Sequence, residues 1–156
     1  MHTTATLDAP CPPEVLSAHV ELLDRYPTWM SLVHRATPER PGDAAGDAAT
    51  AQPAWDVELR TRVGPLARSK RLRMVRTVHE PGRRVVFERR ELDGREHAPW
   101  QLAAVVEDRE PGCRLTMHLA YGGSLWTGGV LQRILDDEIR RASEQLLELV
   151  SSHPTP

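Results

Sequence analysis

The sequence predicts an α+β fold in which an antiparallel sheet is wrapped around one long helix. First, residues 55–121 hold successive segments of alternating apolar and polar residues separated by turn sequences, which is typical of an antiparallel meander. Second, the apolar period becomes helical from Val130 onward. Third, Tyr26-Pro27-Thr28-Trp29 sets a proline and two large aromatics at a corner of the chain. This order of elements indicates a cavity between sheet and helix, suited to an apolar ligand.

The first forty residues predict a strand, two short helices and a second strand. Residues 3–9 contain β-branched residues and end at a group of prolines. Pro12-Pro13-Glu14 opens a helix, because proline suits the first turn and an acidic residue suits the positive helix end. The apolar stripe down to Asp24 is broken, which fits two short helices better than one, and Tyr26-Pro27-Thr28-Trp29 should close the second. Residues 31–37 are the second strand.

Residues 38–54 are rich in Ala, Gly, Asp and Pro and have no apolar periodicity. Such a segment buries little, so we expect a flexible loop at a hairpin tip and no domain boundary. The chain of 156 residues fits one domain, residues 1–156, with a core of its own. We expect residues 152–156 to be a frayed tail.

The meander and the last helix follow from turn sequences and apolar spacing. Asp93-Gly94 is a strong hairpin signal, and three further turns contain Gly-Pro or Pro-Gly. The expected strands are residues 55–63, 68–79, 83–92, 96–108 and 114–121. The glycines of residues 122–129 leave two alternatives open, a gate over the pocket or a plain turn into the helix.

Charge is nearly balanced overall, with a formal net charge of −2, so the composition does not indicate a nucleic-acid-binding protein. Between Arg60 and Arg95, however, twelve basic residues face four acidic ones. This excess predicts a solvated outer face of the sheet, or a surface for an anionic partner. Lys70 is the only lysine, against nineteen arginines, which looks like a GC-rich coding bias.

Nothing in the sequence predicts a membrane span or a signal peptide, and we expect a cytoplasmic protein without stable membrane insertion. The seven histidines and two cysteines form no metal-binding motif, so no metal and no cofactor are expected. Phosphate-loop and nucleophile-elbow motifs are also missing. No catalytic residue can be assigned from the sequence, and the oligomeric state stays open.

The layout resembles the START-related helix-grip superfamily, or SRPBCC group, which includes polyketide cyclase/dehydrase-like proteins and lipid-transfer START domains. The resemblance rests on Asp24-Arg25-Tyr26-Pro27-Thr28-Trp29, on the meander from Trp55 to Tyr121, and on the helix from about Gly128 to Ser151. It implies a seven-stranded antiparallel sheet gripping the last helix, with an apolar pocket between them. It also implies that residues 38–54 are an insertion, and that Cys11 and Cys113 are neighbours, either as two reduced thiols or as a disulfide.

The candidate ligand-binding residues are aromatic or apolar residues at inward positions, with two arginines that share their strand parity. They are Trp29, Leu59, Met74, Arg76, Phe87, Arg89, Trp100, Leu102, Met117, Tyr121, Trp126, Leu131 and Leu135. A charge that faces a cavity is costly unless it is paired. Arg76 and Arg89 would therefore meet a ligand carboxylate or an internal acid such as Glu91, or a bulge would return them to solvent.

Three functions remain in competition, because this superfamily carries many. The first is binding or transport of a hydrophobic small molecule, such as a lipid, an isoprenoid or a polyketide. The second is an aromatase/cyclase-type enzyme that folds a polyketide chain, with Arg76, Arg89 and Tyr121 as its polar groups. The third is an interaction module that uses the basic sheet face. A purely apolar cavity would favour the first, convergent polar groups the second, and a filled core the third.

Overall fold

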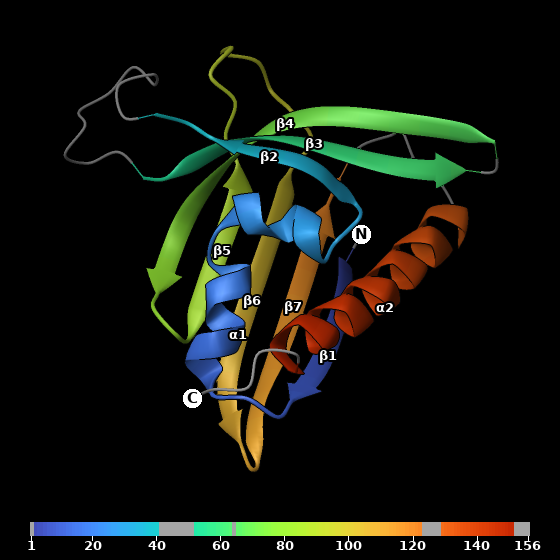
Figure 1. The fold of residues 1–156 in the computed structure, drawn as a ribbon. Helices are drawn as coiled ribbons and strands as arrows, with labels where there is room; N and C mark the ends of the chain where they lie inside the picture. Colours follow the sequence, from blue (N-terminus) through green and yellow to red (C-terminus); the bar gives the residue numbers. More distant parts are fainter. Residues whose placement is uncertain (1, 41–51, 64, 123–128, 152–156) are drawn as a thin grey trace.

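The computed structural model describes residues 2–40, 52–63, 65–122 and 129–151. The order of elements is the expected one (Figure 1). They are β1 (His2–Ala9), α1 (Pro13–Val20), η1 (Leu23–Thr28), β2 (Val33–Pro38), β3 (Ala54–Val63), β4 (Leu66–Glu80), β5 (Arg84–Arg89), β6 (Trp100–Arg109), β7 (Gly112–Tyr121) and α2 (Gly129–Ser151). The predicted loop and tail fall largely outside the description, since residues 41–51 and 152–156 are not part of it.

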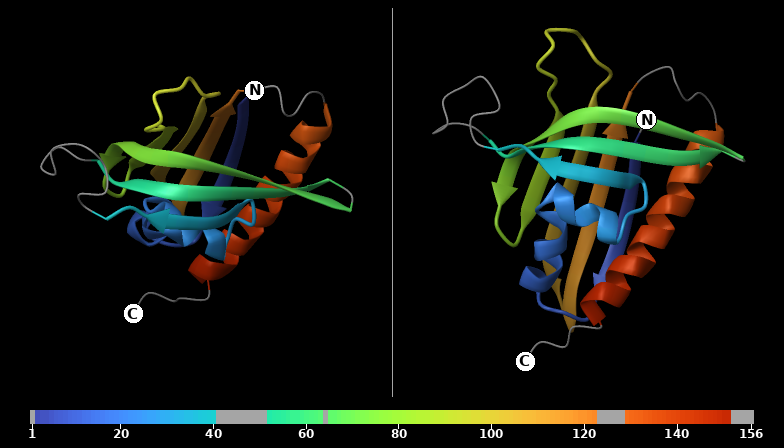
Figure 2. Two further views of the ribbon diagram at one scale, coloured as in Figure 1. Left: turned by 90° about the horizontal axis from the view of Figure 1, so that it is seen from above. Right: turned by 45° about the horizontal axis from the view of Figure 1, so that its top comes forward.

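The strands form one seven-stranded sheet in the order β1-β7-β6-β5-β4-β3-β2, and every neighbouring pair is antiparallel. Figure 1 shows β5, β6, β7 and β1 side by side, while β2, β3 and β4 cross above them. The sheet is thus strongly bent, and α2 lies diagonally on its concave side in both views of Figure 2. The prediction of a helix-grip fold is confirmed.

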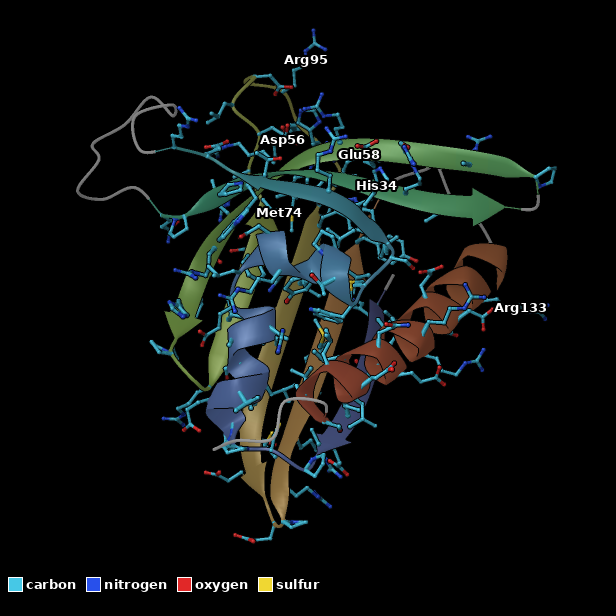
Figure 3. The ribbon with its side chains drawn as sticks, viewed as in Figure 1. His34, Asp56, Glu58, Met74, Arg95 and Arg133 are labelled. Atoms are coloured by element: carbon cyan, nitrogen blue, oxygen red, sulfur yellow. The ribbon has the colours of Figure 1, made fainter. Side chains whose placement is uncertain are left out.

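Alternation in β3 explains how the sheet separates its two faces. Trp55, Val57 and Leu59 are buried on the concave side. Between them, Asp56 and Glu58 project from the opposite face (Figure 3), because successive side chains of a strand point to opposite sides. Asp56 accepts a hydrogen bond from Arg71 on the neighbouring strand β4. Cross-strand ion pairs thus cover the convex face, and apolar side chains fill the concave one.

The two short helices after β1 differ in type. α1 begins after Pro12 with Glu14 in its first turn, as the sequence indicates. η1 is a 3-10 helix that contains Pro27 and ends at Thr28, so the helical segment closes within Tyr26-Pro27-Thr28-Trp29, as the sequence predicts. A 3-10 helix ends within a turn or two, and the backbone N–H groups of Trp29 and Met30 both donate to the carbonyl of Tyr26. The corner therefore forms just after the proline.

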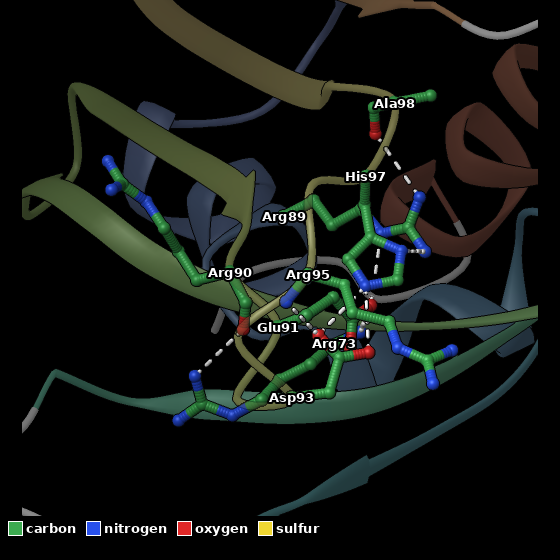
Figure 4. Close-up of polar contacts among 8 residues, drawn as sticks. All are labelled: Arg73, Arg89, Arg90, Glu91, Asp93, Arg95, His97 and Ala98. Carbon is green, nitrogen blue, oxygen red and sulfur yellow. Dashed lines mark hydrogen bonds and ion pairs between the residues drawn. The ribbon is translucent and has the colours of Figure 1, made fainter.

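The segment between β5 and β6 also differs from the prediction of two long strands around a tight Asp93-Gly94 hairpin. β5 ends at Arg89 and β6 begins only at Trp100. Side chains take over the hydrogen bonds here, since Glu91 accepts from the backbone N–H of Arg73 and Asp93 from that of Arg95 (Figure 4). Gly94 does adopt a positive φ of 72°, so the turn is present but the strands stop short of it.

An aromatic cluster fills the concave side beneath the two short helices. Its members, Tyr26, Trp29, Trp55 and Phe87, are at most 3% exposed. Tyr26 contacts Trp29 at 4.7 Å between ring centroids, and Phe87 meets Trp55 edge to face at 5.5 Å, a favoured aromatic geometry. We call these four residues the aromatic cluster. It is a fully packed part of the core on the concave side.

Candidate functional site

A cavity lies between the bent sheet, the residues around η1 and helix α2. The centre of a water-sized sphere can occupy ≈ 80 Å³ of it. A single buried water needs about 10–15 Å³ by the same measure, so this space has room for a small chain or ring. The described wall residues are Thr3, Ala5, Thr6, Leu7, Leu23, Trp29, Met30, Leu32, Val33, Val57, Leu59, Leu72, Met74, Trp100, Leu102, Leu115, Met117, Leu119, Glu138, Ile139, Ala142, Ser143 and Leu146.

The wall is almost entirely apolar, and two of its polar side chains, those of Ser143 and Glu138, are engaged with the protein. Ser143 Oγ donates to the carbonyl of Ile139 at 2.9 Å, one turn back in the helix. Glu138 accepts from the hydroxyl of Ser31 and pairs with Arg141 at 3.6 Å. A guest in this space would therefore meet hydrocarbon on nearly every side, which is the usual composition of a small-molecule pocket.

Six of the thirteen candidate ligand-binding residues belong to this wall. They are Trp29, Leu59, Met74, Trp100, Leu102 and Met117. Strand parity explains why five of them converge, since each faces the concave side of its own strand, and Trp29 joins them from the end of η1. Met74 in the middle of β4 is 5% exposed (Figure 3). Their role in ligand binding stays a prediction, because no ligand is bound in this structure.

Two aromatic candidates lie near the cavity without belonging to its described wall. Phe87 is fully buried in the aromatic cluster. Tyr121, at the end of β7, stacks on Trp100 with 5.1 Å between ring centroids. Burial raises the pKa of Tyr121, and the charge of Asp136 raises it further, so the phenol stays protonated at neutral pH. Tyr121 therefore packs against the wall residue Trp100.

The two candidate arginines do not enter the cavity. A shift of register between Arg76 and Val78 marks a bulge, and Arg76 then donates to the carbonyl of Glu21 at 2.9 Å, with its guanidinium 6.0 Å from the Trp55 ring. Burial lowers the pKa of Arg76. A bulge is present, but it follows Arg76, which stays in register with Phe87 and lies against the end of α1 and not in solvent.

Arg89 meets the internal acid named from the sequence. Its Nε donates to Glu91 Oε1 at 3.0 Å, and its two terminal nitrogens contact the carbonyl of Ala98 and Nδ1 of His97 (Figure 4). The side chain of Arg89 is only 9% exposed. A buried guanidinium requires such partners, so Arg89 is held by the protein itself.

The remaining three candidates cannot be placed. Trp126 lies outside the described residues, and Leu131 and Leu135 belong to α2 but their side chains are not described. Most of the segment expected to form a gate or a turn, residues 123–128, also lies outside the described residues. The helix does contribute Ile139, Ala142 and Leu146 to the wall; sequence analysis placed them in the apolar stripe but not among the candidates.

Sequence analysis missed Lys70, which was counted with the basic residues of the sheet. Lys70 has the strand parity of Leu72 and Met74, two wall residues of β4, and this parity was the signal that could have found it. Its Nζ lies 5.8 Å from the ring centroid of Trp100, within cation–π range. Burial lowers the pKa of Lys70, and the positive charge of Arg89 lowers it further.

The two cysteines lie together, as the resemblance implies. Cys113 begins β7 and pairs in register with Ala9 of β1, which places it near Cys11, and both thiols are free and buried. Burial raises the pKa of Cys113 to about 12 and also raises that of Cys11. Among the residues that the structure describes, no three His, Cys, Asp or Glu side chains are grouped to hold a metal ion.

A family profile described as polyketide cyclase/dehydrase and lipid transport matches residues 1–150. The chain belongs to this family. The helix-grip arrangement and the apolar cavity between sheet and last helix are thus features of a family member, and the resemblance inferred from the Tyr-Pro-x-Trp corner is confirmed. No curated protein sequence matches the chain at a significant level.

Solved structures share the fold of this family member at low sequence identity. A START superfamily protein from Mycobacterium smegmatis has a TM-score of 0.66 at 13% identity, and the match covers 97% of each chain. The protein TTHA0849 from Thermus thermophilus has a TM-score of 0.68 at 14% identity, covering 99% of this chain and 100% of that one. The di-domain ARO/CYC protein StfQ from the steffimycin biosynthetic pathway has a TM-score of 0.67 at 14% identity over 97% of this chain and 50% of its own.

No described helix combines the length and apolar character needed to cross a membrane.

Proposed function

We propose that this protein binds a small hydrophobic molecule in the cavity between its sheet and α2, and carries or presents it. The observation that carries the proposal is the cavity itself, since its described wall is apolar over nearly its whole surface. Removing apolar surface from water contributes about 25 cal/mol per Å², so a hydrocarbon guest gains free energy here without any specific polar contact. Lipids, isoprenoids and polyketides are the ligand classes of that chemistry.

The family description supports this class of ligand. It joins polyketide cyclases and dehydrases with lipid transport, two activities that share an elongated apolar substrate. The size of the cavity favours a guest with a short chain or a single ring. A longer guest would require α2 to move away from the sheet.

A cyclase-type reaction is the second candidate. It requires a proton donor or acceptor within hydrogen-bond reach of the guest. Of the polar groups expected to serve, Arg76 and Arg89 are turned to protein partners. Tyr121 stays protonated beside Trp100 and is the group that favours this alternative. A cyclase would lose turnover in Tyr121→Phe, whereas binding of a guest would persist.

The interaction module receives less support. A basic face attracts an acidic partner only if its charges are free, and several arginines of the outer face already have acids. Arg71 pairs with Asp56 of the neighbouring strand β3, and Arg73 pairs with Glu39, the residue after β2. Both pairs reduce the positive field of the surface.

Native mass spectrometry of the freshly purified protein tests the proposal, with the denatured mass as its reference. Extra mass that disappears on denaturation would be a co-purified guest, and fragmentation of that guest would give its chemical class. The second arm adds octanol to the protein and measures binding by calorimetry. A bare native mass together with no measurable octanol binding would contradict the proposed function.

A further inference from the structure

Two cations lie beside the cavity wall at Trp100, and their charges are unequally paired. Lys70 of β4, Arg89 of β5 and Trp100 of β6 meet there; we call these three residues the polar end. Arg89 is bound to Glu91. Lys70 lies close enough for the charge of Arg89 to lower its pKa. Two cations therefore share this end, and one of them has a carboxylate.

Lys70 is the charge without a counter-ion. Within the described parts of the chain no carboxylate contacts its Nζ, and no acidic group contributes to the shift of its pKa. The aromatic face of Trp100, 5.8 Å away, is its recorded contact. A half-buried ammonium loses hydration, and a ring face returns only part of that free energy. The site is therefore incomplete with respect to negative charge.

Trp100 is also incomplete. Its indole Nε1 is shielded from solvent and has no hydrogen-bond acceptor among the residues described, although buried polar groups are nearly always paired. The contrast with the other described tryptophans is direct. Trp29 donates to the carbonyl of His19 at 3.2 Å, and Trp55 donates to Asp24 Oδ1 at 2.9 Å. Among the described tryptophans, Trp100 is therefore the one whose indole N–H has no acceptor.

We propose that the guest is an amphiphile whose anionic group, a carboxylate or a phosphate, is bound by Lys70 and by the indole N–H of Trp100, with its hydrocarbon part in the cavity. An anionic oxygen satisfies both groups at once: it gives the ammonium a counter-ion and gives the indole an acceptor. Trp100 already belongs to the cavity wall, so head and tail sites are continuous. This inference rests on the proposed function and specifies the ligand class.

Calorimetric titration with three eight-carbon probes tests the proposal: octanol, octanoate and octyl phosphate. A hydrogen-bonded charge is worth about 10- to 100-fold in affinity, so octanoate or octyl phosphate should bind by that factor more tightly than octanol. Whichever anion binds more tightly identifies the source of the charge as carboxylate or phosphate. Equal affinity for all three probes would overturn the inference while leaving the proposed function intact.

Variants assign the preference to the two residues. Lys70→Met keeps the length of the side chain and should abolish the anion preference while octanol binding stays unchanged; Lys70→Arg should restore most of it. Trp100→Phe should weaken octanoate more than octanol. Arg71→Met is the matched control, because Arg71 is the next residue of β4, faces the opposite side and is 73% exposed.

The outcomes separate the two proposals. An anion preference that survives in Lys70→Met, or that is lost equally in Arg71→Met, would overturn the assignment to the polar end. Failure of octanol itself to bind the wild-type protein would overturn the proposed function and the inference together. Melting curves of all variants confirm that the folded protein is compared, and the half-exposed position of Lys70 makes its replacement mild.

Discussion

The aromatic cluster and the polar end lie on the same concave side of one sheet, but they differ in whether their polar ring atoms have hydrogen-bond partners. In the cluster every ring with a polar atom has a partner: Tyr26 Oη donates to the carbonyl of Val20 at 2.8 Å, and the indoles of Trp29 and Trp55 each have an acceptor. At the polar end, Trp100 Nε1 has none among the described residues.

This difference separates a core from a site. A protein gains stability by pairing every buried polar group, and the aromatic cluster follows that rule with its side chains fully packed. The polar end does not follow that rule: Trp100 Nε1 has no acceptor among the described residues, and Lys70 lies beside it without a counter-ion. Departures of this kind are retained where a ligand completes the arrangement. Substitutions at the two places should therefore have opposite consequences, one for stability and the other for binding.

The largest expected effect is the loss of the cluster's central ring. Phe87→Ala removes a fully buried ring that contacts Tyr26 and Trp55, so the free energy of unfolding should fall by about 3–5 kcal/mol. Urea denaturation measures it. The control is Leu92→Ala, whose side chain is 62% exposed and should change stability by no more than about 0.5 kcal/mol. A loss below about 1 kcal/mol for Phe87→Ala would show that the cluster is not the main contributor to the stability of the core.

The same substitution at both places gives the sharpest comparison. Trp55→Phe breaks a hydrogen bond to a carboxylate, and should cost about 1–3 kcal/mol. Trp100→Phe removes an indole N–H that has no acceptor in the described structure, so its cost should stay below about 1 kcal/mol. Urea denaturation of both variants, with octanoate titration of the second, checks the pair. Equal losses of stability would erase the distinction between core and site.

Strand alternation made most of the fold and part of the site predictable. Once the β-strands were located, parity placed Met74, Leu102 and Met117 on the concave side, where the structure has them. Parity also placed Arg76 on this face, where it stays in register with Phe87, but its guanidinium donates to the carbonyl of Glu21 and does not line the cavity. Alternation gives the face of a strand residue but not the partner that a long side chain reaches, so the contact with the end of α1 could not be anticipated.

The polar end was missed for a different reason. Lys70 stands among many arginines, and a charge run usually marks a solvated face. Its parity with Leu72 argued the other way, yet parity does not tell whether an acid lies within reach. Arg89 meets Glu91, which is only two residues further along the chain, whereas the position of Lys70 beside Trp100 follows from the folding of the sheet.

The buried thiols extend the comparison to alkaline pH. The pKa of Cys113 is raised from 9.0 to about 12 by burial, so the unfolded chain releases this proton first as pH rises. Stability should be fully present below pH 9 and fall toward pH 12 by up to about 1.4 kcal/mol per pH unit. Cys113→Ser should flatten this decline in urea denaturation at alkaline pH. A decline of the same slope in Cys113→Ser would show that other groups cause it.

The smallest effect on stability should come from filling the cavity. Ala142 of α2 is 3% exposed and forms part of the wall, so the larger side chain of Ala142→Leu enters existing space. Overpacking a filled core costs about 1–3 kcal/mol, whereas here we expect a change below about 1 kcal/mol together with a roughly tenfold or greater loss of octanol affinity. The control is Ala120→Leu, at the outward parity of β7, which should leave octanol binding unchanged. A large destabilisation of Ala142→Leu would mean that sheet and helix are already closely packed, and would remove the space on which the comparison depends.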